Sequence, residues 1–202
     1  QMLPLKNNPK VALFGKASVD YVKGGGGSGD VFCAYCRSLY DAFNLQENVE
    51  VYKGLHEFYS ADLKAKYDRG YLPGLTTEPE LSADQLKAAR DFSDTAVVSI
   101  TRYSGEGWDR ACDIPGKKLH MENVEVDVWK GEDAMRAMSK EVYPKGDFYL
   151  NESEEKLIAT ATENFSNVIL LLNVGGVIDT SWFSGSKKIG GVLLIGQGGM
   201  EG

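Results

Sequence analysis

A glutamate between two glycines is the first residue whose setting suggests chemistry. Glu106 lies in the stretch TRYSGEGWDR, which spans residues 101–110, and it follows the apolar run Ala96–Thr101. That run is typical of a buried strand, so Glu106 is expected in the loop that leaves the strand. Functional groups of α/β sheets gather at the carboxyl ends of strands, and the flanking glycines free the backbone to turn sharply. Glu106 is therefore a candidate functional residue, with a solvated loop glutamate as the alternative.

A glycine run earlier in the chain offers a second kind of chemistry. Lys23–Gly29 reads KGGGGSG and contains the G-x-G-x-x-G pattern of dinucleotide-binding loops. In that fold the first glycine comes within a residue or two of the strand end, whereas here GKASVDYVK follows Phe14 first. Nucleotide binding is therefore one interpretation. The others are a flexible loop, or a loop whose bare backbone approaches a ligand or a neighbouring domain.

Two cysteines have the C-x-x-C spacing of metal and redox sites. These are Cys33 and Cys36, and Cys112 and His120 are the residues that could complete a zinc site. The spacing from Cys112 to His120 matches no usual zinc pattern, so we expect buried thiols one turn apart on a helix. Neither His120 nor His56 has a sequence partner that suggests nucleophilic catalysis, and surface or packing roles are expected for both.

Five short apolar runs are predicted to be the strands that position these residues. They cover residues 11–14, 49–52, 96–101, 168–173 and 191–196. Runs such as VILLLN and GVLLIG are apolar on both faces, which is typical of a parallel sheet covered by helices on each side. Helical patterns lie between them, at residues 31–43, 55–69, 82–92 and after Asn151. The predicted fold class is α/β, a three-layer sandwich with a mostly parallel β-sheet flanked by helices.

Capping residues mark two of the predicted helix starts. Ser82 precedes the helix at residues 82–92 as a serine cap, and Asn151–Glu154 has the form of a capping box. Leu157, Ile158, Ala161 and Phe165 then share one helical face. The segment 111–146 does not follow the alternation of strand and helix, and we interpret it as an insertion.

Composition excludes several classes of protein. The chain has 202 residues with 43% hydrophobic content, enough to bury a core as one domain, with two small domains as the alternative. A net charge of −7 without a basic stripe argues against nucleic acid and anionic membranes as partners. No apolar run reaches the roughly 20 residues of a membrane-spanning helix, and the amino end lacks a signal-peptide stretch. These two observations predict a soluble chain. Three cysteines make no disulfide framework, so we also expect a cytoplasmic origin.

Five motifs, in this order, carry a resemblance to a known family. They are KVALFG, KGGGGSGDV, SGEGWDR, GDFYLNESEEKLI and VILLLNVGGVIDTSW…GVLLIGQGGMEG. Together they resemble the C-terminal α/β sandwich domain of family 3 glycoside hydrolases of the β-glucosidase type. The resemblance covers nearly the whole chain except residues 111–146.

The resemblance assigns roles to particular residues. In that family a (β/α)8 barrel carries an aspartate nucleophile, and the sandwich domain supplies the general acid/base from a loop over the barrel's mouth. The resemblance implies that Glu106 is this acid/base and that Trp108 is an exposed aromatic platform of the leaving-group subsite. Lys23 and Ser28, on the glycine run, are implied as further substrate-binding residues. Asp109 and Arg110 are expected to brace the loop.

The resemblance also implies what the chain does and what it lacks. We expect the sandwich domain of a retaining β-glycosidase that hydrolyses a β-linked glucoside or related oligosaccharide without a cofactor. The barrel is absent from residues 1–202, the sandwich is expected to be incomplete at its C-terminal end, and the isolated chain is expected to be inactive. Two alternatives stay open: a non-enzymatic carbohydrate-binding or interaction module, and a nucleotide-binding α/β domain.

Overall fold

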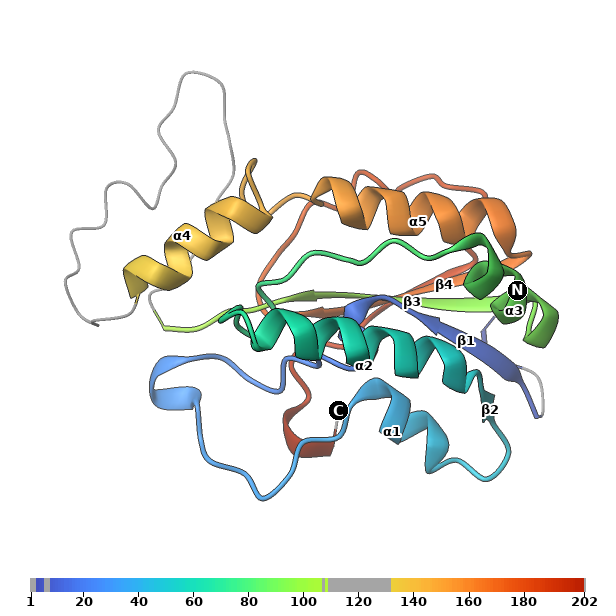
Figure 1. The fold of residues 1–202 in the computed structure, drawn as a ribbon, viewed down its shortest axis with the longest axis horizontal. Helices are drawn as coiled ribbons and strands as arrows, with labels where there is room; N and C mark the ends of the chain where they lie inside the picture. The colour runs from blue at the N-terminus through green and yellow to red at the C-terminus, as the bar shows by residue number, and fades with distance from the viewer. Residues whose placement is uncertain (1–2, 6–7, 107, 109–131, 202) are drawn as a thin grey trace.

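A parallel sheet forms the centre of the molecule. The computed structural model describes residues 3–5, 8–106, 108 and 132–201. The strands are β1 (Lys10–Phe14), β2 (Glu50–Val51), β3 (Thr95–Arg102), β4 (Asn167–Val174) and β5 (Gly191–Leu194). Their order is β2-β1-β3-β4-β5, and each neighbouring pair is parallel. Figure 1 shows the strands running toward one side of the molecule, where the glycine-rich loop and the end of β3 lie. The predicted α/β class is confirmed.

The two longest strands are buried because they are apolar on both faces. All eight residues of β3 and seven of the eight residues of β4 are buried. The two strands pair along their whole length, from Thr95 opposite Asn167 to Arg102 opposite Val174. Such continuous burial is expected for a parallel sheet covered on both sides.

Helices cover the sheet unequally. One face packs against α2 (Lys53–Tyr67), α3 (Ala83–Phe92) and α5 (Glu152–Asn164). The strand residues of that face are Ala12, Phe14, Ala96, Val98, Ile100, Val168, Leu170 and Leu172, and they meet Leu55, Tyr59, Ala89, Leu157 and Ala161 of the helices. The opposite face has a smaller core, covered by the short helix α1 (Leu39–Asn44). No helix in the described part of the chain is long and apolar enough to cross a membrane.

Side-chain caps fix where three helices begin. Ser38, Ser82 and Asn151 each accept a hydrogen bond from the backbone N–H three residues later, and each forms a complete capping box. The predicted helix starts at Ser82 and Asn151 are therefore confirmed. The predicted inner face of α5 is also confirmed, since Leu157 and Ala161 are buried, as is Phe165 just after the helix, and Ile158 packs against the same core.

The predicted helix over residues 31–43 is wrong in its first half. The helix begins only at Leu39, because the Ser38 cap starts it there, and residues 31–37 contain no helix. Their polar groups bond to distant parts of the chain instead: Arg37 N donates to Met200 O at 2.8 Å, and the Arg37 side chain binds Glu201 at 2.7 Å. These partners belong to the 3-10 helix η4 (Gly199–Glu201), which sequence periodicity could not place beside this segment.

The expectation of buried helical thiols is wrong for the same reason. Cys36 is exposed and Cys33 is half-buried, and both lie in the non-helical segment before α1. Because that segment runs over the surface, its apolar side chains stay in solvent, and the exposed fraction of Phe32 reaches 109%.

The described part of the segment 111–146 contains helix α4 (Glu132–Val142). Val142 packs against Leu75 in a small apolar cluster separate from the two sheet faces. Residues 109–131 lie outside the described residues, and with them the expectations for Asp109, Arg110, Cys112 and His120. That the segment is an insertion stays a prediction.

Candidate active site

A buried amide joins the loops at the carboxyl edge of the sheet. Asn173 of β4 is fully buried, and its Oδ1 accepts hydrogen bonds from Val22 N and Thr101 Oγ1, both at 2.8 Å. Its Nδ2 donates to Val22 O at 3.0 Å and to Gly196 O at 2.7 Å. One side chain thus fixes the loops after β1 and β5 relative to the end of β3. Sequence reasoning missed Asn173, although a lone amide in the apolar run VILLLN was a usable signal.

An ion pair buried in the core holds the end of β3, four residues before Glu106. Arg102 Nη1 and Nη2 donate to Glu154 Oε1 and Oε2 at 2.5 and 2.7 Å, and the exposed fractions of the two residues are 1% and 0%. Arg102 also donates to the backbone oxygens of Asp147 and Tyr149. The contacts saturate the guanidinium and the carboxylate, which is the condition for keeping such charges in a core.

The glycine run lies against the loop that carries Glu106. Gly26 N donates to Ser104 O at 3.0 Å, Glu106 N donates to Gly26 O at 3.3 Å, and Gly26 and Gly105 form a parallel bridge. A Cβ added to Gly26 would lie 1.8 Å from the Tyr103 hydroxyl oxygen. The backbones approach too closely for side chains, so these glycines serve contact with the Glu106 loop.

Ser28 of the same run holds the Glu106 carboxylate itself, and Gly27 leaves room for it. Ser28 donates to Glu106 Oε2 from its backbone N at 3.2 Å and from its hydroxyl at 3.1 Å. Gly27 has a φ of +74°, and a Cβ there would lie 2.6 Å from Glu106 Cβ and 2.7 Å from Oε2. Only glycine fits this position without strain or collision.

The carboxylate of Glu106 is exposed and favoured in its charged form. The backbone hydrogen bond from Ser28, and then its hydroxyl bond, hold the pKa of Glu106 below its ordinary value. A carboxylate oxygen that accepts two N–H or O–H bonds is stabilised when ionised, because protonation weakens it as an acceptor. In this domain by itself, Glu106 therefore favours its ionised form, which can accept a proton.

Lys23 and Ser28, the two residues of the glycine run that were predicted to bind substrate, make different contacts. Lys23 Nζ donates to Asp30 Oδ1 at 2.9 Å and to Val31 O at 2.8 Å, and these contacts staple the loop to itself. Ser28 binds Glu106 rather than facing away from it. The expected substrate contacts of Lys23 and Ser28 stay predictions, but the contacts seen here serve the loop.

Trp108 is not the exposed platform that was expected. Its exposed fraction is 8%, and it packs with Leu75, Val142 and Tyr143. The Tyr103 ring meets it edge to face at a centroid distance of 5.7 Å. The indole turns inward because Leu75, in the loop after α2, and the apolar residues in and just after α4 supply partners that are distant in sequence. Trp108 thereby anchors the loop that begins with Ser104.

A cavity of about 880 Å³ opens beside the glycine run. Its wall includes Lys23, Gly24 and Gly25, and Tyr103 from the start of the Glu106 loop. Tyr21 and Tyr67 add aromatic surface, and Asp20 adds a carboxylate. Among the predicted site residues, Lys23 is the one that lines this cavity.

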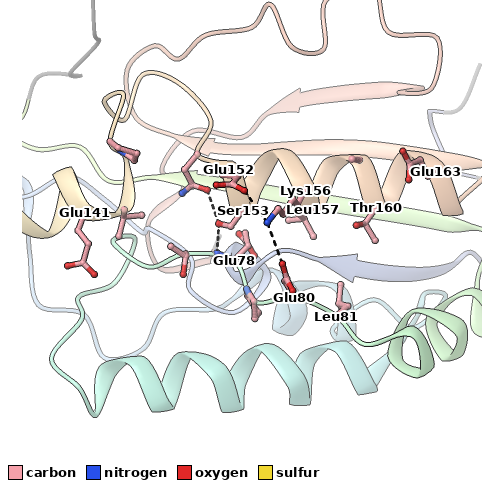
Figure 2. Close-up of a pocket in the computed structure, with 16 residues that line it drawn as sticks. Glu78, Glu80, Leu81, Glu141, Glu152, Ser153, Lys156, Leu157, Thr160 and Glu163 are labelled. Atoms are coloured by element: carbon pink, nitrogen blue, oxygen red, sulfur yellow. Dashed lines mark hydrogen bonds and ion pairs between the residues drawn. The ribbon is translucent and has the colours of Figure 1, made fainter.

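A second cavity, of about 640 Å³, lies against α5 and contains no residue of the glycine run or the Glu106 loop. Figure 2 shows Glu78, Glu80 and Ser153 on its wall, with Lys156 between Glu80 and Glu152. Glu78 is buried, and its Oε2 accepts a hydrogen bond from Lys16 N at 2.8 Å. Within the described residues, its Oε1 has no hydrogen-bond partner.

Burial raises the pKa of Glu78 to about 7, and we expect this to make stability depend on pH. Between pH 4.5 and about 7 the folded chain keeps a proton that the unfolded chain has lost, so the unfolding free energy falls as pH rises. The loss amounts to about 3 kcal/mol across that window. Glu78→Gln should flatten the decline, as measured by calorimetric unfolding temperature against pH in the full-length protein. The exposed neighbour supplies the control, since Glu80→Gln should keep the wild-type slope; an unchanged slope in Glu78→Gln would contradict the assignment.

The described residues support neither a metal site nor a dinucleotide loop at the motifs that suggested them. No group of three His, Cys, Asp or Glu side chains there could hold a metal ion. The glycine run leads into η2 (Gly27–Gly29), a single 3-10 turn, and the next α-helix starts at Leu39. A dinucleotide loop instead opens directly into the helix whose N-terminus binds the pyrophosphate. His56 has a packing role, stacked on Tyr40 at a centroid distance of 3.7 Å.

The sheet is parallel, has helices on both faces and has the exposed Glu106 carboxylate in a loop at its carboxyl edge. These features define an α/β sandwich domain with an acidic side chain at its candidate site. Residues 1–202 match the family model of the glycosyl hydrolase family 3 C-terminal domain. The chain belongs to glycosyl hydrolase family 3 and corresponds to its C-terminal domain. This confirms the family that the five sequence motifs indicated.

The chain is also similar to individual known proteins. Beta-glucosidase A of Butyrivibrio fibrisolvens is 41% identical over 202 residues, which are 100% of this chain and 23% of that protein. Beta-glucosidase 3B of Thermotoga neapolitana, solved with glycerol, aligns with a TM-score of 0.71 at 28% identity, over 100% of this chain and 24% of that one. A beta-glucosidase from Paenibacillus barengoltzii gives a TM-score of 0.73 at 26% identity, over 98% and 19%. The chain thus spans about a quarter or less of the length of these relatives.

Proposed function

We propose that this domain is part of a retaining β-glucosidase and that Glu106 is its general acid/base. The observation that carries the proposal is the exposed Glu106 carboxylate, held by Ser28 on a loop at the carboxyl edge of the sheet. The similarity to proteins named β-glucosidases supports the substrate class, a β-linked glucoside. The sugar pocket and the nucleophile come from a domain outside this chain.

The mechanism divides between two carboxyl groups about 5–5.5 Å apart. In the first step the nucleophile of the other domain attacks the anomeric carbon, and the protonated Glu106 gives its proton to the departing glycosidic oxygen. In the second step the ionised Glu106 takes a proton from water, and the resulting hydroxide oxygen displaces the enzyme carboxylate from the anomeric carbon. Because the anomeric carbon is inverted twice, the product keeps the β configuration.

Glu106 needs a proton for the first step, yet Ser28 favours its charged form in this domain. Approach of a second carboxylate and exclusion of water both raise the pKa of a carboxyl group. We propose that Glu106 becomes protonated when the sugar-binding domain covers it. Because the site is shared between two domains, Glu106 can be protonated as an acid in the first step and ionised as a base in the second.

The stereochemistry of the product tests this proposal. The full-length protein should hydrolyse an aryl β-glucoside and release β-glucose first, because two displacements restore the configuration. Proton NMR of the anomeric signals during the first minutes separates this from later mutarotation. Early release of α-glucose would exclude retention. Carbohydrate binding without hydrolysis would favour the non-enzymatic module.

A further inference from the structure

The contact between Ser28 and Glu106 joins residues 78 positions apart in the chain. Both hydrogen bonds from Ser28 reach the same carboxylate oxygen, Oε2, and neither uses Oε1. A backbone N–H can only donate, so the Oε2 atom it faces must keep acting as an acceptor. A proton on Oε1 therefore leaves both hydrogen bonds to Oε2 intact.

The backbone around this contact leaves little freedom. Gly26 is bound to Ser104 and Glu106 through the parallel bridge, and Gly27 continues in a left-handed conformation that brings Ser28 onto the carboxylate. A side chain on Gly27 would collide with Glu106, since a Cβ there would lie 2.6 Å from Glu106 Cβ. The loop thus limits where the Glu106 side chain can lie.

We propose that Ser28, presented by the turn at Gly26 and Gly27, is a positioning residue that aims Glu106 through Oε2 and stabilises its charged form for the base step. This inference rests on the proposed acid/base role of Glu106. Ser28 acts through Glu106, so it speeds the step that needs a carboxylate and opposes the step that needs a carboxylic acid. The substrate contact expected of Ser28 stays a prediction, and the positioning role is proposed beside it.

Ser28→Ala in the full-length protein separates these two effects. Loss of the hydroxyl bond should slow hydrolysis of the glycosyl-enzyme from an activated aryl glucoside by about 3- to 10-fold, the equivalent of one ordinary hydrogen bond. The alkaline limb of the pH profile of kcat/KM should also move to higher pH. Without the hydroxyl bond, Glu106 keeps its proton up to a higher pH. Ser28→Thr, which keeps a hydroxyl, should restore both. The matched control is Ser104→Ala, whose hydroxyl binds Gln197 rather than Glu106 and should leave the limb in place.

A second pair of variants tests the aim of the carboxylate. Gly27→Ala should lower kcat/KM for an unactivated alkyl glucoside by about 10-fold or more, because the methyl group displaces a catalytic side chain that must be aligned. Gly24→Ala is the control, since a Cβ there meets nothing within 4 Å. The expected ranking is Gly24→Ala near wild type and Gly27→Ala far below it.

The outcomes distinguish this inference from the proposed function. If Glu106→Ala lacks the behaviour of an acid/base variant, the proposed function fails, whatever Ser28 does. If Glu106→Ala behaves as an acid/base variant but Ser28→Ala keeps both the wild-type limb and the wild-type second step, the positioning role is overturned. A uniform loss at every pH in Ser28→Ala, without movement of the limb, overturns it too, since that is the result of a purely structural residue.

Discussion

Replacing Glu106 by alanine in the full-length protein is expected to slow alkyl glucosides by about 100- to 10,000-fold, the range of general acid–base catalysis. An activated aryl glucoside should suffer much less in the first step, because its leaving group needs no proton. Its glycosyl-enzyme should then accumulate, since no base activates the water. A pre-steady-state burst of released phenol, followed by slow turnover, measures this asymmetry.

Azide supplies a second and independent readout of the same variant. Because azide attacks without losing a proton, it should restore turnover of the activated substrate and yield a β-glycosyl azide. Glu80→Gln removes an exposed carboxylate elsewhere and serves as the control that should show neither burst nor azide product. Equal losses on both substrates without azide product would mean that Glu106 is not the acid/base. Glu122 and Glu125, outside the described residues, would then be the next carboxylates to replace.

The second large effect is expected from the buried ion pair at the end of β3. Arg102→Ala should lower the unfolding free energy by about 3–5 kcal/mol, because the Glu154 carboxylate would stay in the core without its partner. Calorimetric unfolding of the domain within the full-length protein measures the loss. The exposed pair of Lys64 and Asp68, at 2.6 Å, provides the control, and Lys64→Ala should cost less than about 1 kcal/mol.

Removing both charges separates the effect of an unpaired buried charge on stability from the effect of losing side-chain volume in the core. The double variant Arg102→Met, Glu154→Leu should be more stable than Arg102→Ala, because no unpaired charge remains in the core. A double variant as unstable as the single one would show that the backbone contacts of Arg102 with Asp147 and Tyr149 dominate. Either result shows which interactions stabilise the end of β3, where the Glu106 loop begins.

The sequence by itself determined the sheet and the helix starts at Ser82 and Asn151. Runs such as VILLLN are apolar at every position, and this pattern predicts a strand buried on both faces whatever surrounds it. The capping boxes at Ser82 and Asn151 depend only on residues three positions apart, so they could be read directly. Glu106 in a glycine-flanked loop after a buried strand was likewise a local pattern.

Only the tertiary structure decided what surrounds Glu106. The hydrogen bonds from Ser28, the inward turn of Trp108 and the path of residues 31–37 all depend on segments far apart in the chain. The residues adjacent in sequence do not show which distant segments will pack together. The stretch around Trp108 would read the same whether the indole were exposed or packed in an apolar cluster. The sequence therefore determined which residue to examine, and packing between distant loops determined how its carboxylate is held, charged and aimed.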